Sequence, residues 1–147
     1  MEIAILGLGC FWGPEIKFSK LEGIIKTEVG YCGGNEKETT YKEVCTGETN
    51  HAEVVKLDFD PKIITYDNIL EFFFKIHDPT TLNSQGPDFG TQYRSEIFYL
   101  NETQKVIAEK IKNNLNKKLF GKVVTKISLV KNYCTAEEYH QKYLEKN

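Results

Sequence analysis

The chain lacks several features that would assign it to a specialised class of protein. It has no apolar run near the roughly 20 residues that a membrane-spanning helix needs. It has no run of basic residues, and its net charge is −2, so we do not expect a nucleic-acid partner. The acidic start Met1-Glu2 and the short apolar run after it do not resemble a signal peptide. We therefore expect a cytoplasmic protein.

The cysteines also lack the spacing of a metal site. The four of them, Cys10, Cys32, Cys45 and Cys134, stand far apart, with no CxxC pair and no cysteine–histidine pair at zinc spacing. A chain of 147 residues can bury its own core without disulfide cross-links. We therefore expect no metal ion and free thiols, at least one of them reactive.

Hydrophobic periodicity predicts strands and helices in alternation, without a repeat, linker or low-complexity segment. The predicted strands are 3–8, 24–31, 52–59, 95–100 and 122–130. The predicted helices are 13–21, 66–77 and 102–119, with a helical turn near 41–44 and a last helix that Thr135 and Glu138 would cap. Asn101 is the predicted N-cap of helix 102–119. Residues 78–94 form a long loop, of a kind that is often functional. This order predicts an α/β (α+β) two-layer sandwich, with a mixed central sheet flanked by helices and a ferredoxin-like core.

One cysteine stands between the first strand and the first helix, in Gly9-Cys10-Phe11-Trp12-Gly13-Pro14. Proline is well tolerated at the first position of a helix. A thiol just before a helix start faces unpaired amide N–H groups and the positive end of the helix dipole. Both favour the thiolate, which is the nucleophilic form. Trp12, the only tryptophan, would place an aromatic wall beside this sulfur.

Further segments accompany this motif along the chain. They are Gly30-Tyr31-Cys32-Gly33-Gly34, Thr40–Gly47, His51-Ala52-Glu53-Val54-Val55, Asp88–Ser95 and Ala136–Gln141. In this order, and without large insertions, the set closely resembles the peptide methionine sulfoxide reductase A family over essentially the whole chain. The resemblance implies that residues 1–147 form a single catalytic domain. It also implies thiol-dependent reduction of methionine-S-sulfoxide, free or within proteins, to methionine.

The resemblance implies that Cys10 is the nucleophile and Glu53 the proton donor. Attack of Cys10 on the sulfoxide sulfur would give methionine and a sulfenic acid on the cysteine. A carboxyl group can protonate the departing oxygen only while it is neutral, which near pH 7 requires burial to raise its pKa. Because strand 52–59 alternates, Glu53 should share a face with Val55, which is compatible with a half-buried acid.

The remaining matched residues would bind and orient the sulfoxide. Phe11 and Trp12 match the family's pocket for the S-methyl group, and aromatic rings make favourable contacts with such sulfur groups. Tyr41 and Tyr93 match two hydroxyls that donate to the sulfoxide oxygen, where charge develops. Asp88 matches a residue that helps to orient the substrate.

Return of the sulfenic acid to a thiol needs an external reductant, and the family implies thioredoxin, glutaredoxin or glutathione. Many members carry a resolving cysteine on a glycine-rich C-terminal tail, which we expect this chain to lack. Cys134 and Cys32 are candidate resolving cysteines, and Cys45 is expected to have a packing role. Direct reduction of Cys10 by an external thiol, without a resolving cysteine, is the possibility that we favour.

Two other functions compete with this assignment. A cysteine hydrolase or acyltransferase would pair Cys10 with His51 or His77 as its base. A redox-sensing or interaction domain would use Cys10 as a sensor thiol. We expect His77 and His140 to be surface or capping residues. Glu15 and Arg94 are expected to be scaffold charges that pair with each other.

Overall fold

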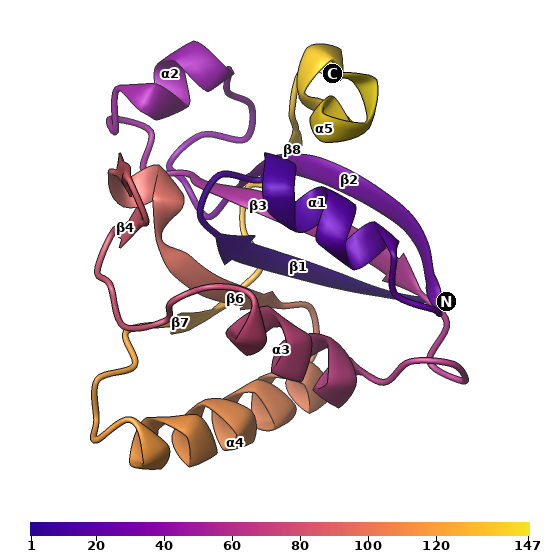
Figure 1. The fold of residues 1–147 in the computed structure, drawn as a ribbon. Coiled ribbons are helices and arrows are strands. Elements are labelled where there is room, and N and C mark those ends of the chain that lie inside the picture. The colour runs from indigo at the N-terminus through magenta and orange to yellow at the C-terminus, as the bar shows by residue number, and fades with distance from the viewer.

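A computed structural model describes residues 1–147 and contains a twisted six-stranded sheet (Figure 1). The strands are β1 (Glu2–Leu8), β2 (Ile24–Cys32), β3 (Ala52–Phe59), β6 (Ser95–Tyr99), β7 (Lys126–Leu129) and β8 (Cys134–Thr135), in the order β7-β6-β1-β3-β2-β8. Only β6 and β7 pair in parallel, so the sheet is mixed. The central order β6-β1-β3-β2 is that of a ferredoxin-like β-α-β-β-α-β unit, which confirms the predicted fold class.

The first four of the five helices begin and end close to the predicted positions. The five are α1 (Trp12–Ser19), α2 (Tyr41–Cys45), α3 (Tyr66–Lys75), α4 (Glu102–Lys118) and α5 (Tyr143–Lys146). Asn101 caps α4 as predicted, because its side chain accepts a hydrogen bond of 2.9 Å from the backbone N–H of Gln104. In Figure 1, α1 lies across the strands and α4 lies beside α3. No helix has the length and apolar character that spanning a membrane requires.

Strand parity divides the buried side chains between the two faces of the sheet. Leu6 of β1 and Val55 of β3 belong to the larger cluster, which α1 and α3 cover. Ile5 and Cys32 belong to a smaller cluster on the other face. Because Glu53 has the parity of Val55, its side chain is directed to the larger cluster, on the side of the sheet opposite that of Cys32.

The C-terminal part of the chain differs from the prediction. The predicted strand 122–130 is regular only in β7, because the backbone N–H of Val124 instead donates to the carbonyl of Pro79 at 2.8 Å. The predicted helix from Thr135 is wrong. Thr135 lies in β8, pairs with Gly30 of β2, and donates its hydroxyl to Glu28. The exposed edge of β2 supplies hydrogen-bond partners that a sequence pattern does not reveal.

The loop 78–94 contains a small hairpin, β4 (Ser84–Gln85) and β5 (Asp88–Phe89), followed by the 3₁₀ turn η1 (Thr91–Tyr93). A second such turn, η2, spans Glu138–His140.

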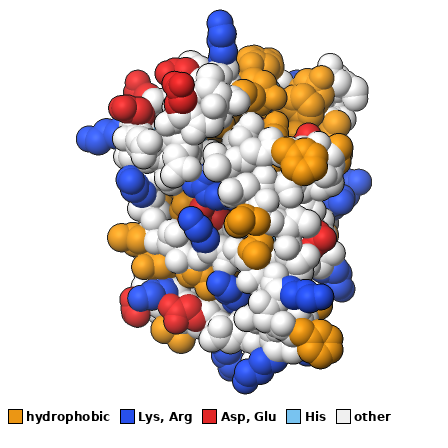
Figure 2. Space-filling model, turned by 90° about the vertical axis from the view of Figure 1, so that its left-hand side faces the viewer, with side chains coloured by type: hydrophobic (Ala, Val, Ile, Leu, Met, Phe, Trp, Pro, Cys, Tyr) orange, Lys and Arg blue, Asp and Glu red, His pale blue; other side chains and the backbone are white.

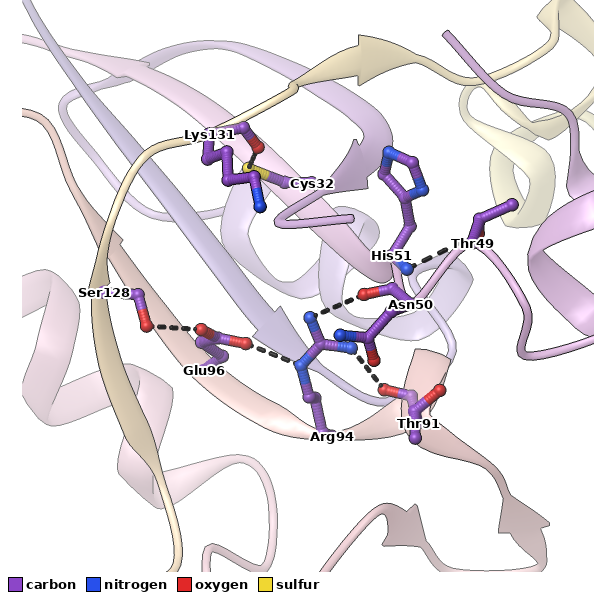
Figure 3. Close-up of polar contacts among 9 residues, drawn as sticks. All are labelled: Cys32, Thr49, Asn50, His51, Thr91, Arg94, Glu96, Ser128 and Lys131. Carbon is purple, nitrogen blue, oxygen red and sulfur yellow. Dashed lines mark hydrogen bonds and ion pairs between the residues drawn. The ribbon is translucent and has the colours of Figure 1, made fainter. Parts of the chain in front are cut away.

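Arg94 anchors the end of this loop. It forms a buried ion pair of 2.6 Å with Glu96 and donates to the carbonyls of Thr91 and Asn50 (Figure 3). The expected pair with Glu15 is wrong, since Glu15 accepts hydrogen bonds from Thr27 and from the backbone of Lys142.

Candidate active site

Cys10 occupies the turn between β1 and α1, where the sequence places it. Gly9 has a φ of +96°, a conformation that lets the chain leave the strand abruptly. A Cβ at Gly9 would lie 2.8 Å from Cβ of Gln85, so the turn also packs closely against the β4–β5 hairpin. Cys10 itself is half-buried.

The environment of Cys10 favours the thiol, contrary to the expectation of a resting thiolate. Burial raises the pKa of Cys10 to about 11, and the negative charges of Glu53 and Asp88 act in the same direction. The backbone N–H of Trp12 acts in the opposite direction but is outweighed by burial. The helix start alone therefore does not ionise this cysteine, because desolvation disfavours its charged form.

Glu53 has the environment that a neutral acid requires. It lies opposite Tyr31 across β2 and β3 and is 1% exposed. Its Oε1 accepts a hydrogen bond of 3.3 Å from the backbone N–H of Phe11, whereas the buried Oε2 has no partner. Burial raises the pKa of Glu53 to about 8, although the Phe11 N–H opposes this shift. At pH 7 the carboxyl group is therefore mostly protonated, as the sequence analysis required.

Tyr41 and Tyr93 lie close enough to Glu53 for its charge to act on both. Burial is the main cause that raises the pKa of Tyr93 to about 12, with Glu53 next. Burial is also the main cause that raises the pKa of Tyr41. The Cys45 thiol and the charges of Tyr93 and Glu53 raise it further. Both hydroxyls are therefore neutral donors at pH 7. Asp88 of β5 is half-buried and its charge acts on Cys10, Glu53 and Tyr93, so it belongs to the same cluster.

Phe11 and Trp12 form an aromatic wall beside these polar groups. Phe11 is 1% exposed, with its ring centroid 5.7 Å from that of Tyr31. Trp12 is half-buried and stacks on Tyr143 of α5 at a centroid distance of 3.8 Å. The C-terminal segment therefore closes one side of the wall.

The C-terminal segment contributes residues to the site that the sequence did not predict. The expectation that His140 is a surface or capping residue is wrong, because His140 is 1% exposed and its Nδ1 accepts a hydrogen bond of 3.0 Å from the Trp12 indole. Glu137 accepts hydrogen bonds from the Tyr31 hydroxyl at 2.7 Å and the Tyr41 backbone at 2.9 Å. Both residues lie in the family-like segment Ala136–Gln141, which was the only signal available for them.

The other cysteines differ in their position relative to the site. Cys32 is fully buried, is directed to the opposite face of the sheet, and lies 3.3 Å from the carbonyl of Lys131 (Figure 3). Cys134 pairs with Tyr31 and is half-buried, so it shares the face of the sheet that carries Glu53. It lies in β8 and does not precede a helix.

Neither candidate base for a cysteine hydrolase hydrogen-bonds Cys10. His51 Nε2 lies 2.9 Å from the carbonyl of Glu36. His77 caps α3 through a contact of 2.6 Å between its Nδ1 and the Phe73 carbonyl, and its Nε2 lies 2.8 Å from the Ser95 hydroxyl. Because both rings are held by other partners, the geometry does not support the Cys–His alternative.

The face of the molecule seen in Figure 2 has mixed character. Acidic side chains gather at one upper corner, hydrophobic ones at the other, and basic ones along the lower edge.

Two exposed aromatic residues are neighbours of site residues in the sequence. Phe89 follows Asp88 and is 78% exposed, and Tyr139 precedes His140 and is 57% exposed.

The whole chain is similar to proteins of one family. A family model described as peptide methionine sulfoxide reductase matches residues 2–147. The protein named peptide methionine sulfoxide reductase MsrA from Pelagibacter ubique is 80% identical over 146 residues, which cover 99% of both chains. An MsrA of Methanococcus maripaludis is 51% identical over 145 residues, or 99% of this chain and 92% of that one.

Solved structures give the same result. The crystal structure of reduced Mxr1 from Saccharomyces cerevisiae superposes with a TM-score of 0.95 at 45% identity, covering 99% of this chain and 85% of that one. The structure of Mxr1 in complex with Trx2 superposes with a TM-score of 0.69 at 29% identity, covering 97% and 84%.

Proposed function

The chain belongs to the peptide methionine sulfoxide reductase family, and we propose that Cys10 performs its reaction, the reduction of methionine-S-sulfoxide to methionine. Substrates would include the free amino acid and oxidised residues in proteins, which the enzyme would repair. The observation that carries this assignment is the buried Glu53, neutral near pH 7, which accepts a hydrogen bond of 3.3 Å from the backbone N–H of Phe11, the residue after Cys10. Residues 1–147 would act as one catalytic domain.

The reaction conserves protons. A thiol and a sulfoxide become a sulfenic acid and a thioether, so the oxygen moves from the substrate sulfur to Cys10 with no net gain of hydrogen. As Cys10 attacks, Glu53 protonates the sulfoxide oxygen, and the proton that leaves the thiol restores Glu53. A neutral thiol beside a neutral carboxyl group holds both of the protons that this exchange uses.

The oxygen and the methyl group of the substrate require different surroundings. Tyr41 and Tyr93, both neutral, would donate hydrogen bonds to the oxygen as its negative charge grows. Phe11 and Trp12 would contact the S-methyl group, and Asp88 would orient the substrate from the β4–β5 hairpin. Preference for the S epimer is carried over from the family, because separate enzymes reduce the two epimers of methionine sulfoxide.

An external thiol would then reduce the sulfenic acid. The solved complex of Mxr1 with Trx2 supports thioredoxin as the electron donor, with glutaredoxin and glutathione as further candidates. We propose that no metal or other cofactor takes part. Cys134 is better placed to resolve the sulfenic acid than Cys32, because it shares the face of the sheet that carries Glu53. Direct reduction of Cys10 remains our preferred route. All four cysteines are free thiols, which agrees with a cytoplasmic location.

The test uses the resolved S and R sulfoxides of acetyl-methionine with dithiothreitol. The wild-type protein should form thioether from the S sulfoxide in molar excess over enzyme, and Cys10→Ser should form none. A sensor domain would give at most one product per protein, and a cysteine hydrolase would instead release a burst of product from an activated ester. Full activity of Cys10→Ser would overturn the assignment.

A further inference from the structure

His140 lies against the aromatic wall and has no part in the mechanism described above. Its Nδ1 accepts the indole N–H of Trp12 at 3.0 Å, although 128 positions separate the two residues. We infer that His140 is a positioning residue that fixes the orientation of the Trp12 indole and so shapes the pocket for the S-methyl group. This inference rests on the proposed function, because it assumes that Trp12 contacts the substrate.

The hydrogen bond defines the state of the imidazole. Because Nδ1 accepts, the neutral ring carries its proton on Nε2. Burial lowers the pKa of His140, which keeps this neutral form at pH 7, although the charge of Glu137 acts in the opposite direction. The neutral ring can therefore serve as an acceptor for Trp12 under the conditions in which the enzyme works.

The environment of the second ring nitrogen of His140, Nε2, indicates why a histidine occupies this position. Nε2 is buried and has no hydrogen-bond partner. An unpaired buried polar atom lowers stability, and a phenyl ring would fill similar space without that cost. The contact with Trp12 is the only hydrogen bond of the His140 side chain. The acceptor at Nδ1 is therefore what an imidazole contributes at this position and a phenyl ring would not.

The packing around Trp12 explains what the hydrogen bond adds. Tyr143 stacks on the indole, with an interplanar angle of 11°. Stacking limits the tilt of the indole but leaves rotation within its own plane less restricted. A hydrogen bond at the indole N–H removes this rotation, so His140 and Tyr143 together define one orientation.

The same imidazole also contacts other parts of the site. Its centroid lies 5.2 Å from the Phe11 ring and 4.6 Å from the Tyr41 ring. One side chain thus touches both aromatic members of the methyl pocket and one hydroxyl donor. His140 acts through these residues, so it is not itself a catalytic residue.

Two substitutions separate the hydrogen bond from the packing. His140→Phe keeps a ring and removes the acceptor. His140→Asn removes the ring and keeps an acceptor near the position of Nδ1. We expect His140→Phe to raise KM for acetyl-methionine S-sulfoxide about fivefold to tenfold, the equivalent of one neutral hydrogen bond, with a smaller effect on kcat. His140→Asn should restore part of this loss.

Trp12 is the only tryptophan, so its fluorescence reports on this contact without any turnover. The emission spectrum should shift in His140→Phe and return toward that of the wild type in His140→Asn. An emission spectrum unchanged by His140→Phe would overturn the inference, even in a fully active enzyme. Activity that survives Cys10→Ser would overturn the proposed function instead, so the two failures can be told apart.

A double-mutant cycle completes the test. In a Trp12→Phe background the indole N–H is gone, so His140→Phe should leave KM unchanged. An equal rise of KM in that background would show that His140 acts independently of Trp12 and would contradict the inference.

Discussion

The carboxyl group of Glu53 is held by the backbone N–H of Phe11, 3.3 Å from Oε1, while Oε2 is buried without a partner. Phe11 directly follows Cys10, so a single hydrogen bond connects the strand that carries the proposed proton donor to the turn that carries the proposed nucleophile. The partnerless oxygen is the atom of this carboxyl group that is free to exchange a proton with the substrate.

The pH dependence of the first turnover should report the proton on Glu53. Its pKa is raised to about 8, so the proton is present below that pH and is lost above it. The rate of methionine formation in a single turnover, measured without reductant, should therefore fall above about pH 8.

Glu53→Gln is the control for this profile. Its rate should be about 10²- to 10⁴-fold lower, because an amide cannot transfer the proton. The decline above pH 8 should also disappear. If the decline persists in Glu53→Gln, another group must carry the titrating proton.

The fate of the Cys10 sulfenic acid can be followed by mass spectrometry after one turnover. We expect an added oxygen on Cys10, and we expect Cys32→Ser, Cys45→Ser and Cys134→Ser to keep near-full turnover with dithiothreitol. If a disulfide forms in the wild type and is absent only from Cys134→Ser, then Cys134 resolves the sulfenic acid and direct reduction is not the route.

Removal of Arg94 should destabilise the protein by about 3–5 kcal/mol, because it leaves the buried Glu96 carboxylate unpaired. The expected change is a lower denaturation midpoint for Arg94→Met in urea. The double variant with Glu96→Leu should recover part of the loss. A change below about 1 kcal/mol for the single variant would mean that this ion pair contributes little.

Gly34 should not tolerate a side chain. A Cβ there would lie 2.1 Å from Nδ1 of the buried His51, so Gly34→Ala should cost about 1–3 kcal/mol through overpacking. Gly13→Ala is the matched control, since nothing lies within 4 Å of its Cβ and alanine favours a helix by up to about 1 kcal/mol. In thermal melts, the midpoint of unfolding should fall for Gly34→Ala and rise for Gly13→Ala.

The sequence by itself determined most of the fold. Strand 52–59 and the Asn101 cap of α4 are where local patterns place them, because alternation and capping depend on neighbouring residues only. The family-like segments also predict roles for Cys10 and Glu53, residues whose chemical types already suit the proposed reaction.

Only the tertiary structure decided the state of those groups and the role of the C-terminal segment. The thiol of Cys10 is neutral because burial outweighs the local effect of a helix start, and burial depends on residues distant in sequence. Likewise β8 forms on the free edge of β2, and His140 reaches Trp12 from the far end of the chain. No local pattern encodes such contacts, since their energy comes from segments that meet only after the chain has folded.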